Sequence, residues 1–168
     1  MEKIPPRTYE IQAGYILGFE NLQSWVDWAD EAIVAGFDSQ SLRILAGLQQ
    51  PYDELEINRL STKAFIELNI IPLKVESCIS YYITTILRQT LDGKLTQKQT
   101  LLKLMQLYLA THHEKSLKDF YLLYHAASDL ETSKDQWYWK GANRKNIAKI
   151  IDDYFQDWLK NHGQSVPA

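Results

Sequence analysis

Three of the four histidines fall in one stretch of the sequence and are the first candidates for metal chemistry. His112 and His113 precede Glu114, and His125 follows shortly after. Imidazole and carboxylate groups are common zinc ligands. Adjacent residues of a helix point about 100° apart, however, so His112 and His113 cannot both face one ion. No H-E-x-x-H or E-x-x-H spacing occurs, and Cys78 has no second cysteine. We therefore predict no metal site, and attribute the two adjacent histidines to the carbonyl end of a helix.

The motifs of common catalytic and cofactor sites are missing from the sequence. It contains no G-x-S-x-G nucleophile elbow, no phosphate-binding G-x-x-x-x-G-K-[ST] loop and no G-x-G-x-x-G fingerprint. Separate serines, histidines and aspartates occur in any helical protein of this size. We therefore predict no catalytic residue and no cofactor, and lean toward a protein that is not an enzyme. An enzyme or small-ligand-binding protein with a pocket between helices is the alternative, because such groups can converge from distant positions.

Three consecutive aromatic residues, Trp137, Tyr138 and Trp139, form the most unusual segment of the chain. On a helix, neighbouring side chains diverge by about 100°, so the three cannot all face the interior. Two interpretations stay open for residues 136–141. Either the segment is irregular and packs over the core, or part of it is exposed to contact a partner or ligand.

Basic residues follow these aromatics, where the last helix is expected to begin. Arg144 and Lys145 would lie in its first turn, where positive charge opposes the helix dipole. Local rules are often broken at functional sites, so this corner is a candidate contact surface. Nucleic-acid binding through residues 134–149 is a second alternative. The competing interpretation is that acidic residues from another helix neutralise the cluster, or that it is simply solvated. The residues concerned are Lys134, Trp137, Trp139, Lys140, Arg144, Lys145 and Lys149.

An acidic counterpart occurs in the expected second helix. Asp27 and Glu31 stand four residues apart and share a face, close in sequence to Trp25 and Trp28. Acidic groups beside aromatic residues suit recognition of a basic surface. The ordinary alternative is a solvated polar helix face.

Composition indicates one globular chain without a membrane segment. The 168 residues are 45% hydrophobic, and 18 basic against 21 acidic residues give a net charge of -3. This balance does not indicate a nucleic-acid or membrane-surface protein. The first residues lack the apolar core of a signal peptide, and a lone cysteine suits a reducing compartment, so we expect a cytoplasmic location. The burial of Cys78 is not determined by the sequence.

Apolar residues recur every three to four positions along most of the chain, which predicts helices. Expected helix starts lie at Asn21, Ser39, Asp53, Thr96 and Ser116, and Pro72 is expected in the first turn of the helix after it. Residues 80–86 are rich in strand-favouring side chains, but the apolar pattern extends over residues 75–91, which is too long for a typical strand and favours helix. We predict an all-α fold: one compact domain, 1–168, of seven to eight helices with irregular or bundle-like packing. Residues 1–7 and 164–168 are expected to be flexible ends.

The run from Tyr9–Gly14 through Trp25–Asp30 to Leu45–Leu48 resembles the opening of small uncharacterised bacterial all-helical proteins. Some proteins of that kind are immunity proteins that neutralise toxins. The resemblance implies a helical, protein-binding role and assigns no functional residue. We therefore predict a non-enzymatic protein-binding module, acting by steric occlusion in the manner of an immunity protein, with an unknown protein partner and contacts through the basic corner, Asp27 and Glu31. The sequence does not identify the partner or the oligomeric state.

Overall fold

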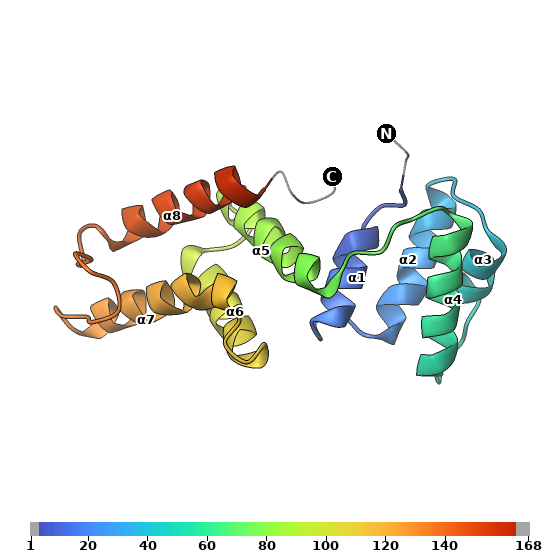
Figure 1. The fold of residues 1–168 in the computed structure, drawn as a ribbon, viewed down its shortest axis with the longest axis horizontal. Coiled ribbons are helices and arrows are strands. Elements are labelled where there is room, and N and C mark those ends of the chain that lie inside the picture. Colours follow the sequence, from blue (N-terminus) through green and yellow to red (C-terminus); the bar gives the residue numbers. More distant parts are fainter. Residues whose placement is uncertain (1–3, 164–168) are drawn as a thin grey trace. The chain divides into compact units, whose positions relative to one another are not determined.

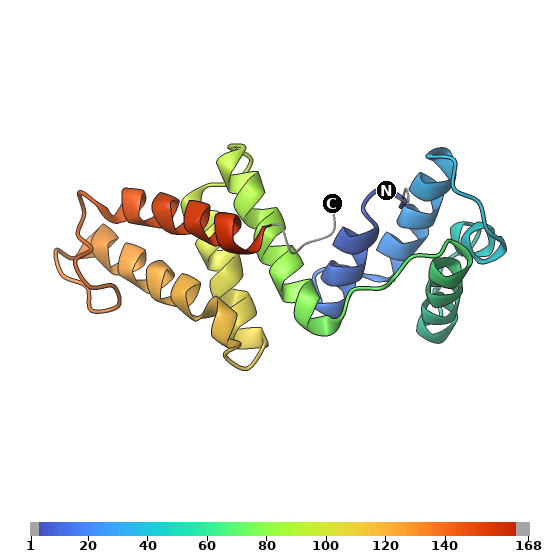
Figure 2. The same ribbon diagram turned by 45° about the horizontal axis from the view of Figure 1, so that its top comes forward.

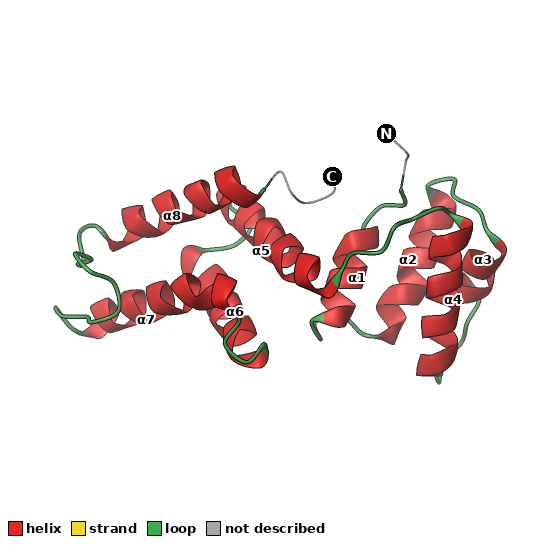
Figure 3. Ribbon diagram, in the orientation of Figure 1, coloured by secondary structure: helices red, strands yellow, loops and turns green. Residues whose placement is uncertain are grey.

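The computed structural model describes residues 4–163, and every regular element in that range is helical (Figure 3). This confirms the predicted all-α fold. The elements are α1 Thr8–Ile16, α2 Leu22–Val34, α3 Gln40–Ala46, α4 Glu54–Glu67, α5 Val75–Leu91, α6 Gln97–Ala110, the 3₁₀ helix η1 Lys115–Leu117, α7 Lys118–Thr132 and α8 Ile147–His162 (Figure 1). Segment 75–91 is the helix α5, as its length indicated. None of the helices described combines the length and apolarity needed to cross a bilayer.

The chain divides into two compact units, residues 1–82 and 83–168, with the boundary inside α5. The predicted single domain stays a prediction, because two such units can still unfold together. Residues 1–3 and 164–168 of the expected flexible ends lie outside the described residues. Residues 4–7 are described: Pro5 is buried and its carbonyl accepts a 2.7 Å hydrogen bond from the Thr8 hydroxyl.

The first unit packs α1 and α2 together, with α3 and α4 against α2. Its core is centred on aromatic rings: Trp25, Trp28 and Phe65 lie within about 6 Å of one another, edge-on or tilted. Trp28 is fully buried, and its indole N–H donates to the Thr8 hydroxyl at 3.0 Å. Aliphatic side chains fill the rest of this core: Ile11, Leu42, Leu45, Ile57 and Leu60.

The second unit packs α6, α7 and α8. Leu101 and Leu104 of α6, Phe120 and Leu123 of α7, and Phe155 of α8 are buried. Figure 2 shows α7 and α8 side by side, joined by a long loop at one end of the unit.

The predicted helix starts are mostly confirmed. The side chains of Asn21, Ser39 and Asp53 each accept a hydrogen bond from a backbone N–H in the first turn of α2, α3 and α4. Thr96 and Gln99 form the full reciprocal capping box of α6. Each of these caps joins residues three positions apart, so the pattern is visible in the sequence.

The predicted Ser116 cap is wrong, because the Glu114 side chain accepts from the Ser116 backbone N–H and starts η1 instead. The predicted position of Pro72 is also wrong: it lies in the irregular segment between α4 and α5. That segment is held by α1. The Gln12 amide exchanges hydrogen bonds with the backbone of Leu73, accepting at 2.9 Å and donating at 3.3 Å.

Candidate functional site

The loop between α7 and α8, residues 133–146, separates the three consecutive aromatic side chains. Trp137 is 93% exposed, whereas Tyr138 is 40% exposed and Trp139 is partly buried. Trp139 therefore packs onto the helices, as the first interpretation expects, and Trp137 projects into solvent; that Trp137 contacts a partner or ligand stays a prediction. We call residues 133–146 the contact loop.

The backbone of the contact loop is organised by Gln136. Its Oε1 accepts hydrogen bonds from the N–H groups of Tyr138 at 2.9 Å and Trp139 at 2.8 Å. Its Nε2 donates to the carbonyl oxygens of Trp139 at 2.6 Å and Ala142 at 3.1 Å. The side-chain amide thus fixes the backbone that follows Trp137, where no helix supplies these hydrogen bonds. Sequence reasoning missed this residue, because a glutamine beside an aromatic run has no distinctive signal.

Tyr138 fastens the contact loop to α7. Its ring stacks on His125 with centroids 5.0 Å apart and planes at 29°. His125 in turn meets the ring of Tyr121 edge-on at 4.5 Å. His125, a metal candidate by type, is therefore a packing residue in this structure.

Trp139 fastens the loop to α8. Its ring meets Tyr154 edge-on at 5.7 Å. The Tyr154 hydroxyl donates to the carboxylate of Asp119 at 3.0 Å. Burial raises the pKa of the Tyr154 phenol, and the Asp119 charge and hydrogen bond act in the same direction, so this phenol stays protonated as a donor. The base of the loop is therefore held on two sides.

Arg144, like Lys145, does not lie in the first turn of a helix, contrary to prediction, because α8 begins only at Ile147. Its Nε donates to the Leu130 carbonyl at 2.8 Å, in the last turn of α7. A guanidinium at the carbonyl end of a helix interacts favourably with the helix dipole. The apparent conflict between this charge and its helix disappears once both helices are considered.

The other cations of the predicted basic corner differ in whether they form an ion pair. Lys149 lies in α8 and forms an ion pair with Asp153, one turn later in the same helix, so its acidic partner does not come from another helix as that interpretation expects. Lys134, Lys140 and Lys145 are exposed and make no ion pair within residues 4–163. Three free ammonium groups therefore belong to the contact loop and accompany the exposed Trp137.

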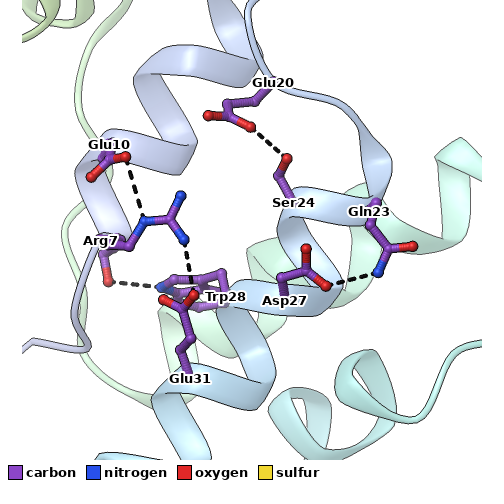
Figure 4. Close-up of polar contacts among 9 residues, drawn as sticks. Arg7, Glu10, Glu20, Gln23, Ser24, Asp27, Trp28 and Glu31 are labelled. Atoms are coloured by element: carbon purple, nitrogen blue, oxygen red, sulfur yellow. Dashed lines mark hydrogen bonds and ion pairs between the residues drawn. The ribbon is translucent and has the colours of Figure 1, made fainter.

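Asp27 and Glu31 lie in the first unit and the contact loop in the second, so the structure does not establish one surface containing both sets. Both carboxylates already have partners (Figure 4). Asp27 accepts from Gln23 at 2.8 Å, and Glu31 accepts from Arg7 at 2.9 Å. Arg7 also pairs with Glu10 at 3.4 Å.

The remaining candidate residues for metal binding or catalysis do not come together in one site within residues 4–163. His112 and His113 follow α6, both with positive φ angles, of 53° and 68°. Within residues 4–163, no three His, Cys, Asp or Glu side chains are grouped so that they could hold a metal ion. Cys78 is buried, and burial, with the nearby Glu76, raises the pKa of its thiol, which disfavours the reactive thiolate.

The contact loop is thus the surface on which exposed aromatic area, free positive charge and a fixed backbone coincide. It is defined by geometry, without support from related proteins. No protein-family model matches the chain, and comparison with curated proteins and with solved structures gives no match.

Proposed function

We propose that this chain is a non-enzymatic protein-binding module that docks its partner through the contact loop, with Trp137 as the anchor. The observation that carries the proposal is the 93% exposure of Trp137 on a loop held by its own hydrogen bonds. Exposed tryptophan is costly in water, and tryptophan is enriched among residues that dominate interface energetics. A buried anchor of this type contributes about 2 kcal/mol or more to binding.

Preorganisation supports the proposal. Ordering a loop on binding lowers affinity, and a loop that is already ordered avoids that loss. Gln136 fixes the backbone on one side of Trp137, while Tyr138 and Trp139 pack onto α7 and α8. Trp137 has only two side-chain torsions left to restrict, so little entropy is lost when it is buried.

The positive charge of the contact loop indicates the chemistry of the partner surface. Lys134, Lys140 and Lys145 surround the anchor in sequence, and Asp135 is the one carboxylate among residues 133–146. A complementary surface would hold an apolar pocket for the indole ring, rimmed by Asp or Glu side chains. Occlusion of a toxin by such a surface, as the resemblance to immunity proteins implies, is one form of this proposal.

The test compares baits that differ only in exposed apolar residues. The wild-type chain, Trp137→Ser and Leu55→Ser are used for affinity capture from native cells after mild crosslinking. Leu55 is a matched control because it is 81% exposed and lies in the first unit. We expect a protein retained by wild type and Leu55→Ser and lost with Trp137→Ser, with a purified-complex affinity at least about 30-fold lower for that variant.

Two results would contradict the proposal. One is that all three baits capture the same proteins, or that none of them captures any protein. The other is Trp137-dependent retention of an oligonucleotide that falls steeply with salt, which would favour the nucleic-acid alternative.

A further inference from the structure

Three tyrosine rings contact His125 of α7. Tyr121 and Tyr124 of the same helix meet its imidazole edge-on, with centroids 4.5 Å and 5.2 Å away, and so hold it in place. Tyr138 of the contact loop stacks on it at 5.0 Å, with planes at 29°. His125 forms no ion pair with a carboxylate within residues 4–163. We infer that protonation of His125 tightens the stack with Tyr138, and so makes the contact loop more ordered at mildly acidic pH.

The sign of the effect follows from the stacked ring. A cation within about 6 Å of the centroid of an aromatic ring is attracted to the face of that ring. Tyr138 presents its face to His125 within this distance, whereas neutral imidazole gains only the weaker stacking contact there. Imidazole changes its charge between about pH 5 and pH 8. The extra order is therefore present below this range and is lost as the pH rises through it. Because His125 is partly exposed, its charged form keeps contact with water.

The charged groups of α6 and α7 near His125 do not oppose this effect. Asp129 lies one turn further along α7, on the same face, and attracts an imidazolium. Lys98 of α6 interacts with Tyr124, but its charge is offset by Glu131, whose two carboxylate oxygens each accept from the Lys98 ammonium at 2.9 Å. The surroundings of His125 on the helices are therefore not positive.

A second histidine belongs to the same series of ring contacts. His113 meets Tyr108 of α6 at 4.9 Å, and Tyr108 meets Tyr121 at 4.8 Å. Two tyrosines thus separate His113 from His125. His113 titrates in the same range of pH but has no described contact with the contact loop, which makes it the matched control for His125.

The stack acts directly beside the proposed anchor. Tyr138 follows Trp137, and its N–H donates to Gln136 at 2.9 Å, so a tighter stack restricts the backbone next to Trp137. An imidazolium also adds to the net positive charge of the contact loop, whose charged side chains are all exposed and therefore screened by solvent: Lys134, Asp135, Lys140, Arg144 and Lys145. The consequence, which rests on the proposed function, is that an acidic partner is bound more tightly at mildly acidic pH.

The test uses the full chain without a partner and follows hydrogen exchange of the Tyr138 and Trp139 amides at about pH 5.5 and about pH 7.5. Each rate is divided into that of an unstructured chain at the same pH, which gives a protection factor free of the intrinsic pH dependence. We expect wild-type protection to be about two- to fivefold greater at the lower pH, as for one exposed cation–π contact. His125→Phe keeps a ring beneath Tyr138 but binds no proton, so its protection factors should be equal at both pH values. His113→Gln should behave like wild type.

If His125→Phe does not fold, the wild-type chain still decides the question. The protection factors must then change at the pH at which the NMR signal of the His125 ring changes, and His113→Gln identifies the other ring signal. Equal protection at both pH values in wild type, weaker protection at the lower pH, or a pH dependence that persists in His125→Phe or is lost in His113→Gln would each overturn the inference. Because no partner is present, these outcomes are independent of the capture experiment with Trp137→Ser, which tests the proposed function.

Discussion

The Arg144 guanidinium donates from Nε to the Leu130 carbonyl oxygen at 2.8 Å, and so joins the turn before α8 to the last turn of α7. The two residues are 14 positions apart and close the contact loop at its base. The sequence suggests that Arg144 lies at the N-terminal end of α8, where positive charge is unfavourable. In the structure its guanidinium instead lies at the carbonyl end of α7, where positive charge is favourable. In this structure Arg144 therefore holds the base of the contact loop, and a contact between its guanidinium and a partner stays a prediction.

Arg144→Ala should accordingly destabilise the protein, whereas Lys145→Ala should not. The loss expected for Arg144→Ala is about 1 kcal/mol, the usual contribution of one hydrogen bond with a charged donor at a partly exposed site. Urea unfolding of both variants measures the difference. Equal stability of the two variants would show that the Arg144–Leu130 contact contributes nothing.

Gln136→Ala should loosen the contact loop without unfolding the unit. The variant removes the acceptor of the Tyr138 and Trp139 amides, so their hydrogen exchange should accelerate about tenfold or more as local opening becomes easier. Partner affinity should fall although Trp137 is still present, because the loop must then be ordered on binding. Gln106→Ala, on the exposed face of α6, is the control and should leave both amides unchanged.

Helix positions were largely predictable because the signals that start helices are local. Asn21, Ser39 and Asp53 cap helices through backbone groups three residues away, which a single sequence displays directly. Pro72 was misplaced because its segment is fixed by Gln12, which bonds a residue 61 positions further along the chain. No periodicity reveals a contact of that kind.

The candidate site was predictable only in outline. The sequence marks Trp137 and its neighbours as unusual, because three adjacent aromatics cannot share one face. Which of them is exposed depends on Gln136, His125 and Tyr154, and these contacts require the packed helices.

Thr8→Val should destabilise the first unit by about 1–3 kcal/mol, the cost of leaving a buried donor without an acceptor. The Thr8 hydroxyl accepts from the Trp28 indole at 3.0 Å and donates to the Pro5 carbonyl at 2.7 Å. Valine keeps the shape and removes both bonds. Thr8→Ser keeps the hydroxyl and should retain most of the stability in denaturant unfolding. Should the two variants prove equally stable, the hydrogen bond would have no role in holding Trp28.

Glu67 should make the stability of the first unit depend on pH. Its carboxylate accepts from the Ser41 backbone N–H at 2.9 Å and from the Ser41 hydroxyl at 2.8 Å, near the start of α3. These bonds, the backbone one first, lower the pKa of Glu67 below its ordinary 4.5. A carboxyl whose pKa is lower in the folded state stabilises the protein above its unfolded-state pKa, and this stabilisation disappears as the pH falls through the folded-state pKa.

Glu67→Gln should therefore lower the melting temperature near pH 7, and the difference from wild type should shrink at an acid pH below the folded-state pKa, where the wild-type carboxyl is protonated. Asp30→Asn is the matched control, because it removes an exposed carboxylate of the same unit with no hydrogen bond described. That variant should differ little from wild type at either pH. If Glu67→Gln lowers the melting temperature equally at both pH values, then the shape of the side chain, and not its charge, accounts for the contact between Glu67 and α3.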